Sequence, residues 1–143
     1  MAAFNEKKWI FAMLLSILLL GYAMNSQLMK APSASDSIQA PQSVTAEEVI
    51  SCAENIVRTL ARDDDRWDAR ITRRDVDAGI LETGNFEEEN ESGFRVRIGF
   101  EGKTGKIDIA LKGAGAYFVD MGVKEAIVEF NTSMRECLVK PTE

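Results

Sequence analysis

The motif most suggestive of chemistry is Gly102-Lys103-Thr104, which ends the signature of phosphate-binding loops. The full signature also needs a glycine five positions before Gly102, and a helix after the loop whose N-terminus faces the phosphates. Arg97 occupies that earlier position, and an alternating strand pattern follows Thr104. The motif therefore predicts a β-hairpin turn, in which glycine supplies positive φ, and no nucleotide site.

A cluster of acidic side chains, the residue type that binds hard cations, follows the first helix predicted in the domain. The cluster comprises Asp63, Asp64, Asp65 and Asp68. It lacks the glycine and the closing glutamate of a calcium-binding loop. We interpret it as a charged helix end, and we predict no metal site and no cofactor.

Other catalytic groups are scarce, because the chain of 143 residues contains no histidine. Histidine is the commonest general base and the usual pH switch near neutrality. Ser51, Tyr117 and Asp120 are the remaining candidates, and no pair of groups is spaced to form a catalytic site around them. We therefore assign no catalytic residue and expect the protein not to be an enzyme.

A basic patch is the feature most suggestive of binding. Four basic residues alternate with other residues on two predicted strands, namely Arg95, Arg97, Lys106 and Lys112. Pairing of these strands would gather them on the exposed face of a sheet, where they either bind an acidic partner surface or another anion, or only balance Glu101 and Asp108. The net charge of −6 argues against nucleic acid as the partner.

The N-terminal residues predict export from the cytoplasm. Residues 1–8 form a short charged segment, and an apolar stretch follows from Trp9 to Met29 (residues 9–29). Basic residues before this stretch favour a cytoplasmic N-terminus with the rest translocated. Two alternatives remain open, namely a retained single-pass transmembrane anchor and a signal peptide cleaved after Ala23.

The next segment, residues 30–44 (KAPSASDSIQAPQSV), is rich in Ser, Ala and Pro. It has almost no apolar periodicity and predicts a flexible linker. Residues 45–140 then form the domain, which we expect outside the cytoplasm, in the periplasm or the extracellular space. Depending on the fate of the leader, the domain is membrane-anchored or secreted.

The domain sequence begins and ends with a predicted amphipathic helix. Thr45 and Glu48 predict a capping box, and apolar residues at spacings of three and four continue the first helix to about Ala61. A second apolar stripe, from Val123 to Leu138, predicts the last helix.

Alternating residues predict the strands between the helices. Residues 94–101 and 106–112 each have one wet and one buried face, and residues 63–78 predict one or two strands. Residues 116–119 suggest a short further strand, and residues 84–93 (GNFEEENESG) an acidic, solvated loop. The expected fold is an α+β two-layer sandwich, helix, antiparallel sheet of three to four strands, helix, preceded by the N-terminal apolar helix.

The only two cysteines, Cys52 and Cys137, lie on the apolar faces of the two domain helices. Antiparallel packing of the helices would bring the second turn of the first close to the last turn of the second. An even cysteine count in an exported domain predicts a disulfide between them.

Two functions follow from these features. The first is a membrane-tethered envelope domain that binds another envelope or membrane protein as an accessory or assembly subunit, without catalysis. The alternative is a small secreted inhibitor or immunity-type protein released by signal-peptide cleavage.

Overall fold

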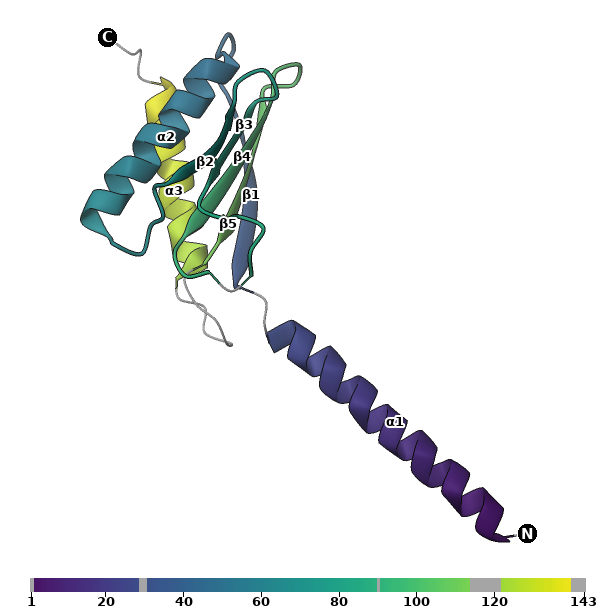
Figure 1. The fold of residues 1–143 in the computed structure, drawn as a ribbon. Helices are drawn as coiled ribbons and strands as arrows, with labels where there is room; N and C mark the ends of the chain where they lie inside the picture. Colours follow the sequence, from purple (N-terminus) through teal and green to yellow (C-terminus); the bar gives the residue numbers. More distant parts are fainter. Residues whose placement is uncertain (1, 29–30, 90, 114–121, 140–143) are drawn as a thin grey trace.

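The computed structural model describes residues 2–28, 31–89, 91–113 and 122–139. The elements in these residues are α1 Ala2–Leu28, β1 Ser33–Gln39, α2 Ala46–Asp63, β2 Ile71–Asp75, β3 Ile80–Thr83, β4 Arg95–Glu101, β5 Lys106–Lys112 and α3 Val123–Val139. Within this part of the chain the strands form one antiparallel five-stranded sheet in the order β1-β5-β4-β3-β2. α2 and α3 lie side by side against one face of the sheet (Figure 1). The predicted α+β class is confirmed.

The core lies between the sheet and these two helices. Each helix contributes one apolar face, with Val49, Ala53, Val57 and Phe130 among its buried side chains. The strands contribute every second residue, which the alternation predicted for Val96, Ile98, Ile107, Ile109 and Leu111, and Leu81 is buried in the same way. Each large apolar side chain of this kind stabilises the fold by about 1.5–3 kcal/mol on burial.

The first domain helix begins as predicted. The Thr45 Oγ1 accepts a hydrogen bond from the Glu48 N–H at 3.3 Å, and the Thr45 N–H donates to Glu48 Oε2 at 2.7 Å. This reciprocal pair is the capping box, which satisfies backbone donors that the first turn leaves open.

β1 corrects two predictions, the flexible linker at residues 30–44 and the sheet of three to four strands. Ser33–Gln39 pairs along its whole length with β5, from Ser33 opposite Lys112 to Gln39 opposite Lys106. An edge strand needs few apolar residues, because its backbone ladder can be formed by any residue and only Ile38 is deeply buried. The segment therefore lacks the apolar periodicity from which a strand is predicted.

The segment before β2 also departs from the prediction. Residues 67–71 alternate like a strand, but β2 begins only at Ile71. The preceding chain turns because Asp68 Oδ1 accepts a hydrogen bond from the Arg70 N–H at 3.0 Å, which closes an Asx turn. β3, at Ile80–Thr83, was not predicted, since four residues are too few to show a period.

The disulfide prediction is confirmed. Cys52 of α2 and Cys137 of α3 are bonded, with their Cα atoms 6.0 Å apart. The bond joins the first helix of the domain to the last, across a sequence separation of 85 residues.

α1 projects away from the domain (Figure 1), and its side chains from Trp9 to Tyr22 are exposed. Among the described residues, no helix combines the length and the hydropathy needed to cross a membrane, and residue 29 of the predicted stretch 9–29 lies outside them. The predicted strand at residues 116–119 lies outside the described residues.

Candidate functional site

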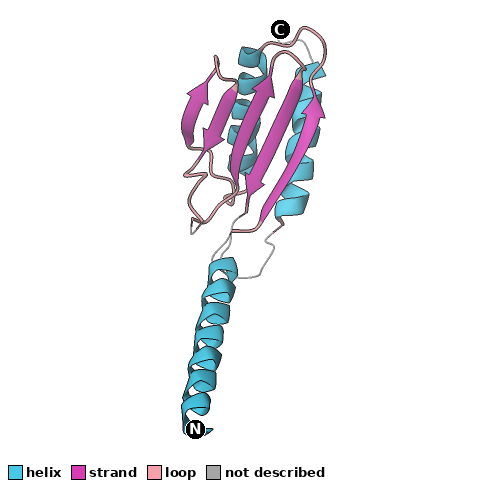
Figure 2. Cartoon of the chain, turned by 90° about the vertical axis from the view of Figure 1, so that its right-hand side faces the viewer, coloured by secondary structure: helices cyan, strands magenta, loops and turns pink. Residues whose placement is uncertain are grey.

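The face of the sheet that α2 and α3 leave uncovered, here called the open face, is the candidate functional site (Figure 2). Its side chains are those that alternate with the core residues along each strand. They are Ser35 and Ser37 of β1, Asp108 and Ala110 of β5, Arg97 and Gly99 of β4, Ile80 and Glu82 of β3, and Arg73 of β2. The open face therefore combines small, hydroxyl-bearing and charged side chains from five strands.

A hollow of about 800 Å³ lies on the open face, and the residues just named line it together with Asp36 and Glu87. Its floor is low because two central strands carry Gly99 and Ala110 where longer side chains would stand. A Cβ atom added at Gly99 would have no other atom within 4 Å, so the space above this glycine is open. Glycine inside a strand often marks a site where another backbone or a ligand approaches closely.

Ion pairs rim the hollow. Arg97 Nε donates to Glu82 Oε1 at 2.7 Å, and the other side of its guanidinium forms a short ion pair with Glu87. Asp108 pairs with Lys106 at 2.8 Å. These charges hold one another in place, and they present both signs to a ligand.

Arg95 is not on the surface, although its place on the strand predicts an exposed side chain. It is fully buried, because the loop of residues 84–93 folds over it. Its guanidinium donates to the carbonyl oxygens of Asn85 at 2.6 Å, Glu88 at 2.5 Å and Glu91 at 3.2 Å. Burial lowers the pKa of Arg95 from its ordinary value, and the carboxylates around it oppose that shift. Arg95 therefore holds a loop and does not face a partner.

The acidic loop of residues 84–93 packs on the sheet more closely than a solvated loop would. Phe86 is buried, with the Arg97 guanidinium 4.2 Å and the Lys112 ammonium 5.4 Å from its ring centroid. Glu89 accepts a hydrogen bond from Lys112 at 2.8 Å and another from the Ala31 N–H at 3.0 Å. The carboxylates of Glu87 and Glu89 in this loop are thus paired with cations of the sheet.

The structure brings together three residues of the predicted basic patch, Arg95, Arg97 and Lys112, and puts Lys106 at the other end of β5. Arg95 is covered, Arg97 and Lys112 are paired with the acidic loop, and Lys106 is paired with Asp108. Partner binding by these residues stays a prediction, but each cation already has an anionic or carbonyl partner. Balance of local charges, the other reading of the same pattern, accounts for these contacts.

Acid is expected to loosen the acidic loop. The hydrogen bond between Glu87 and Arg97 lowers the pKa of Glu87 below the ordinary value near 4.5. The hydrogen bond between Glu89 and Lys112 likewise lowers the pKa of Glu89. A depressed pKa contributes stability above the unfolded pKa that is lost as the pH falls through the folded pKa. Wild type should therefore be more stable than the double variant Glu87→Gln/Glu89→Gln at pH 6. Thermal unfolding should show this gap narrowing as the pH falls below the ordinary carboxylate value near 4.5; a gap that does not change with pH would contradict the assignment.

The glycine turn and Ser51 are held by hydrogen bonds within the chain. The hairpin prediction for Gly102-Lys103-Thr104 is confirmed, because the Gly105 N–H bonds to the Glu101 carbonyl at 2.8 Å between paired strands. Ser51 is hydrogen-bonded to Glu47 on α2, at 3.1 Å. Tyr117 and Asp120 lie outside the described residues.

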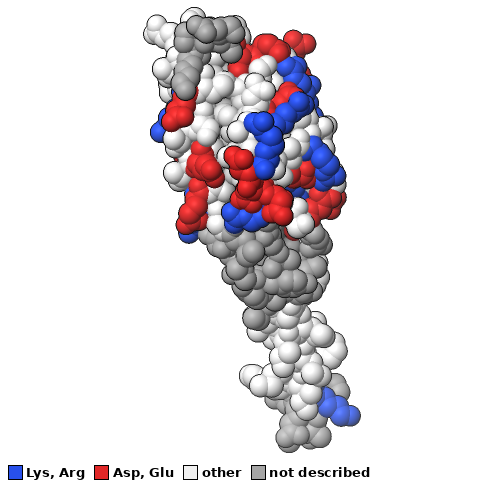
Figure 3. Space-filling model, turned by 90° about the vertical axis from the view of Figure 1, so that its left-hand side faces the viewer, with Lys and Arg blue, Asp and Glu red and all other residues white. Residues whose placement is uncertain are grey.

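The predicted absence of a metal site rests on the acidic cluster, of which Asp64 and Asp68 bind Arg66 and Arg70 at 2.6 Å each. No group of three potential metal ligands occurs in the part of the chain that the structure describes. Acidic and basic side chains also lie next to one another on the helix side of the domain (Figure 3).

Sequence reasoning missed the hollow itself. Gly99 was the available signal, as a glycine in the middle of an alternating strand. The other walls come from β1 and β3, which the sequence did not predict as strands.

No protein-family model matches the sequence, and no curated protein is significantly similar to it.

Proposed function

We propose that this protein is an exported, non-catalytic domain that docks another envelope or membrane protein on its open face, as an accessory or assembly subunit. The observation that carries the proposal is the hollow, because a helix-free sheet face with a floor of small side chains offers space for a partner. Binding a partner on a sheet face needs no catalytic acid–base pair. The charged groups at the rim of the hollow are paired with one another, as such a binding face allows.

Export is supported by the disulfide and by the leader. Disulfides persist in oxidising compartments and are rare in the cytosol. Residues 1–29 carry the charged start and apolar run of an export signal, which either keeps the domain at the membrane or is removed. The Cys52–Cys137 bond favours the periplasm or the extracellular space as the place where the domain works.

Site-specific photocrosslinking in the native cell tests the docking face. A photoreactive residue in place of Ser37, exposed beside the hollow, should give a crosslinked product of one defined mass. The same residue in place of Glu136, exposed on α3, is the matched control and should not give that product. Adding Gly99→Val should abolish the Ser37 product, because the new side chain fills the floor without meeting another atom at its Cβ.

Crosslinking from Glu136 and not from Ser37 would contradict docking on the open face. So would a Ser37 product that Gly99→Val leaves unchanged. Thermal unfolding of the variant provides the folding control, since valine favours a strand and its midpoint should not fall.

A secreted inhibitor or immunity-type protein is the second candidate. It is favoured by the small residues Gly21 and Ala23, which suit a cleavage site after Ala23. N-terminal sequencing of the mature chain would then begin at Met24, whereas an intact leader on the exported protein would remove this candidate.

A further inference from the structure

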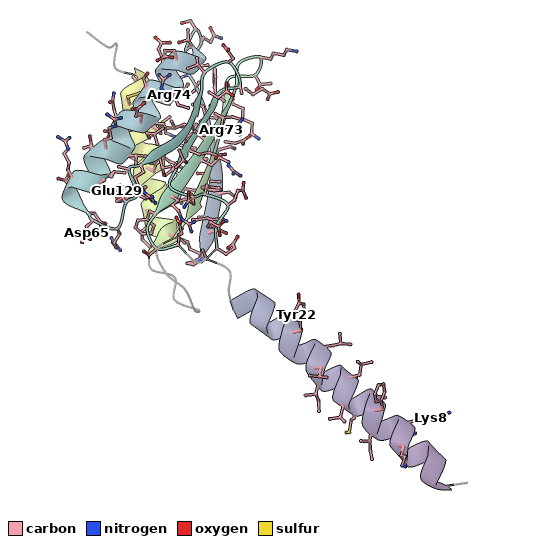
Figure 4. All side chains as sticks on the ribbon, viewed as in Figure 1. Lys8, Tyr22, Asp65, Arg73, Arg74 and Glu129 are labelled. Atoms are coloured by element: carbon pink, nitrogen blue, oxygen red, sulfur yellow. A yellow bond between two sulfur atoms is a disulfide. The ribbon has the colours of Figure 1, made fainter. Side chains whose placement is uncertain are left out.

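Arg73 is the cation of the hollow with the most available hydrogen-bond donors. Its guanidinium is 48% exposed, and its ion pairs, 3.7 Å to Asp75 and 3.9 Å to Glu82, are longer than hydrogen bonds. In the described residues its side chain donates no hydrogen bond, unlike Arg97 beside it. Figure 4 shows Arg73 on the side of β2 away from α2, whereas Arg74 reaches toward α2 and binds Glu47 there. Arg73 is therefore placed to form a bidentate bond with an incoming carboxylate.

Asp108 offers the opposite charge across the hollow. Its side chain is 62% exposed and pairs with Lys106, two residues away on the same strand face. An exposed pair of this kind contributes only about 0–1 kcal/mol, so Asp108 can exchange Lys106 for a cation of a ligand at little cost.

Gly99 lies between these two charges. In the sheet register it stands opposite Asp108 on one side and Ile80 on the other, and Ile80 stands opposite Asp75 of β2. The path from β5 to β2 crosses three strand spacings, about 14 Å, and Arg73 lies two residues before Asp75, about 7 Å along β2, so the two charges are about 16 Å apart. The space directly above Gly99 is open, because a Cβ atom added there would meet no other atom within 4 Å.

An extended peptide can reach both charges, because the side chains of Arg73 and of a basic peptide residue are long enough to bridge the difference of about 3 Å. An extended chain advances about 3.3 Å per residue, so residues i and i+4 are about 13 Å apart. Residues i and i+4 also point to the same side of an extended chain. A peptide crossing the strands can therefore put both end side chains into the hollow.

We propose that the hollow binds an extended segment of the partner that lies across the strands. An Asp or Glu of the segment binds Arg73, and a Lys or Arg four residues away binds Asp108, with small or apolar residues over Gly99 and Ile80. This inference rests on the proposed function and specifies the chemistry of the docked segment.

Random heptapeptides displayed on phage, selected on the immobilised full-length chain, are the probe. Selected sequences are expected to be enriched in an acidic and a basic residue at i and i+4, in either chain direction. A selected peptide made synthetically should bind the Arg73→Gln and Gly99→Val variants at least tenfold more weakly than wild type. Thr132→Leu on the helix side is the matched control and should bind as wild type does.

A charge exchange tests direct contact. Arg73→Glu should lose the selected peptide, and replacing the peptide's acidic residue by lysine should restore binding to that variant. An effect of Arg73 on folding alone would not be rescued in this way.

The inference is overturned if no peptide is enriched, if no i, i+4 charge pair appears, or if the exchange fails to restore binding. The proposed function would survive these results if the Ser37 crosslink persisted, because a folded partner surface would then occupy the hollow. Failure of both the peptide test and the Ser37 crosslink would overturn this inference and the proposed function together.

Discussion

Reduction of the Cys52–Cys137 bond is expected to lower the free energy of unfolding by roughly 4 kcal/mol. The bond closes a loop between residues 85 positions apart, and the chain-entropy model assigns about that stabilisation to so long a loop. For a domain whose total stability is about 5–15 kcal/mol, the loss is severe. Urea unfolding with and without reductant measures it.

The double variant Cys52→Ala/Cys137→Ala is the matched control for reduction. Its stability should be low and should not change when reductant is added. A wild-type protein whose stability is equally insensitive to reductant would contradict the structural role of the bond. Mass spectrometry after alkylation adds a test of compartment, because two modifiable thiols in the native protein would contradict export to an oxidising space.

Replacement of Arg95 by methionine is expected to cost about 3 kcal/mol of stability. The variant leaves the carbonyl groups of Asn85, Glu88 and Glu91 without their shared donor, and each unsatisfied buried group costs about 1–3 kcal/mol. Because the loop is partly exposed, water can satisfy some of these carbonyl groups, and the total cost is lower than the sum of the three. Urea unfolding measures the change, and limited proteolysis should show faster cleavage in residues 84–93.

Two variants serve as comparisons for Arg95. Arg97→Met, two positions along the same strand, removes two partly exposed ion pairs, with Glu82 and Glu87, and should cost less, about 0–1 kcal/mol for each pair. Arg95→Lys keeps the charge but loses the planar fork that reaches several carbonyls, so its stability should fall between wild type and Arg95→Met. Equal losses for Arg95→Met and Arg97→Met would contradict the special role of the buried guanidinium.

The same loop explains why Arg95, which the basic-patch prediction put on an exposed face, is buried. Strand alternation correctly put Arg95 and Arg97 on the side of the sheet away from the helices. Whether that side is wet depends on residues 84–93, whose composition of four glutamates predicts solvent exposure. Their carboxylates and carbonyls instead find cations on the sheet, so that the loop packs through pairs that are distant in the sequence.

The sequence by itself determined the elements whose signal is local. These elements are the capping box at Thr45 and Glu48, the apolar faces of both domain helices, the alternation of β4 and β5, and the glycine turn between them. Each of them depends on the types of a few neighbouring residues. The disulfide could also be predicted, because both cysteines lie on faces that must be buried in the same core.

Only the tertiary structure decided the edge strand, the burial of Arg95 and the hollow. β1 is a strand because β5 offers it an unpaired backbone edge, and that edge exists only after the hairpin has folded. Arg95 is buried because a loop ten residues upstream supplies its acceptors. The hollow forms because strand pairing puts Ser35 opposite Ala110 and puts Gly99 two residues along the neighbouring strand. Each of these features depends on contacts between distant segments, and no local pattern of residue types records such contacts.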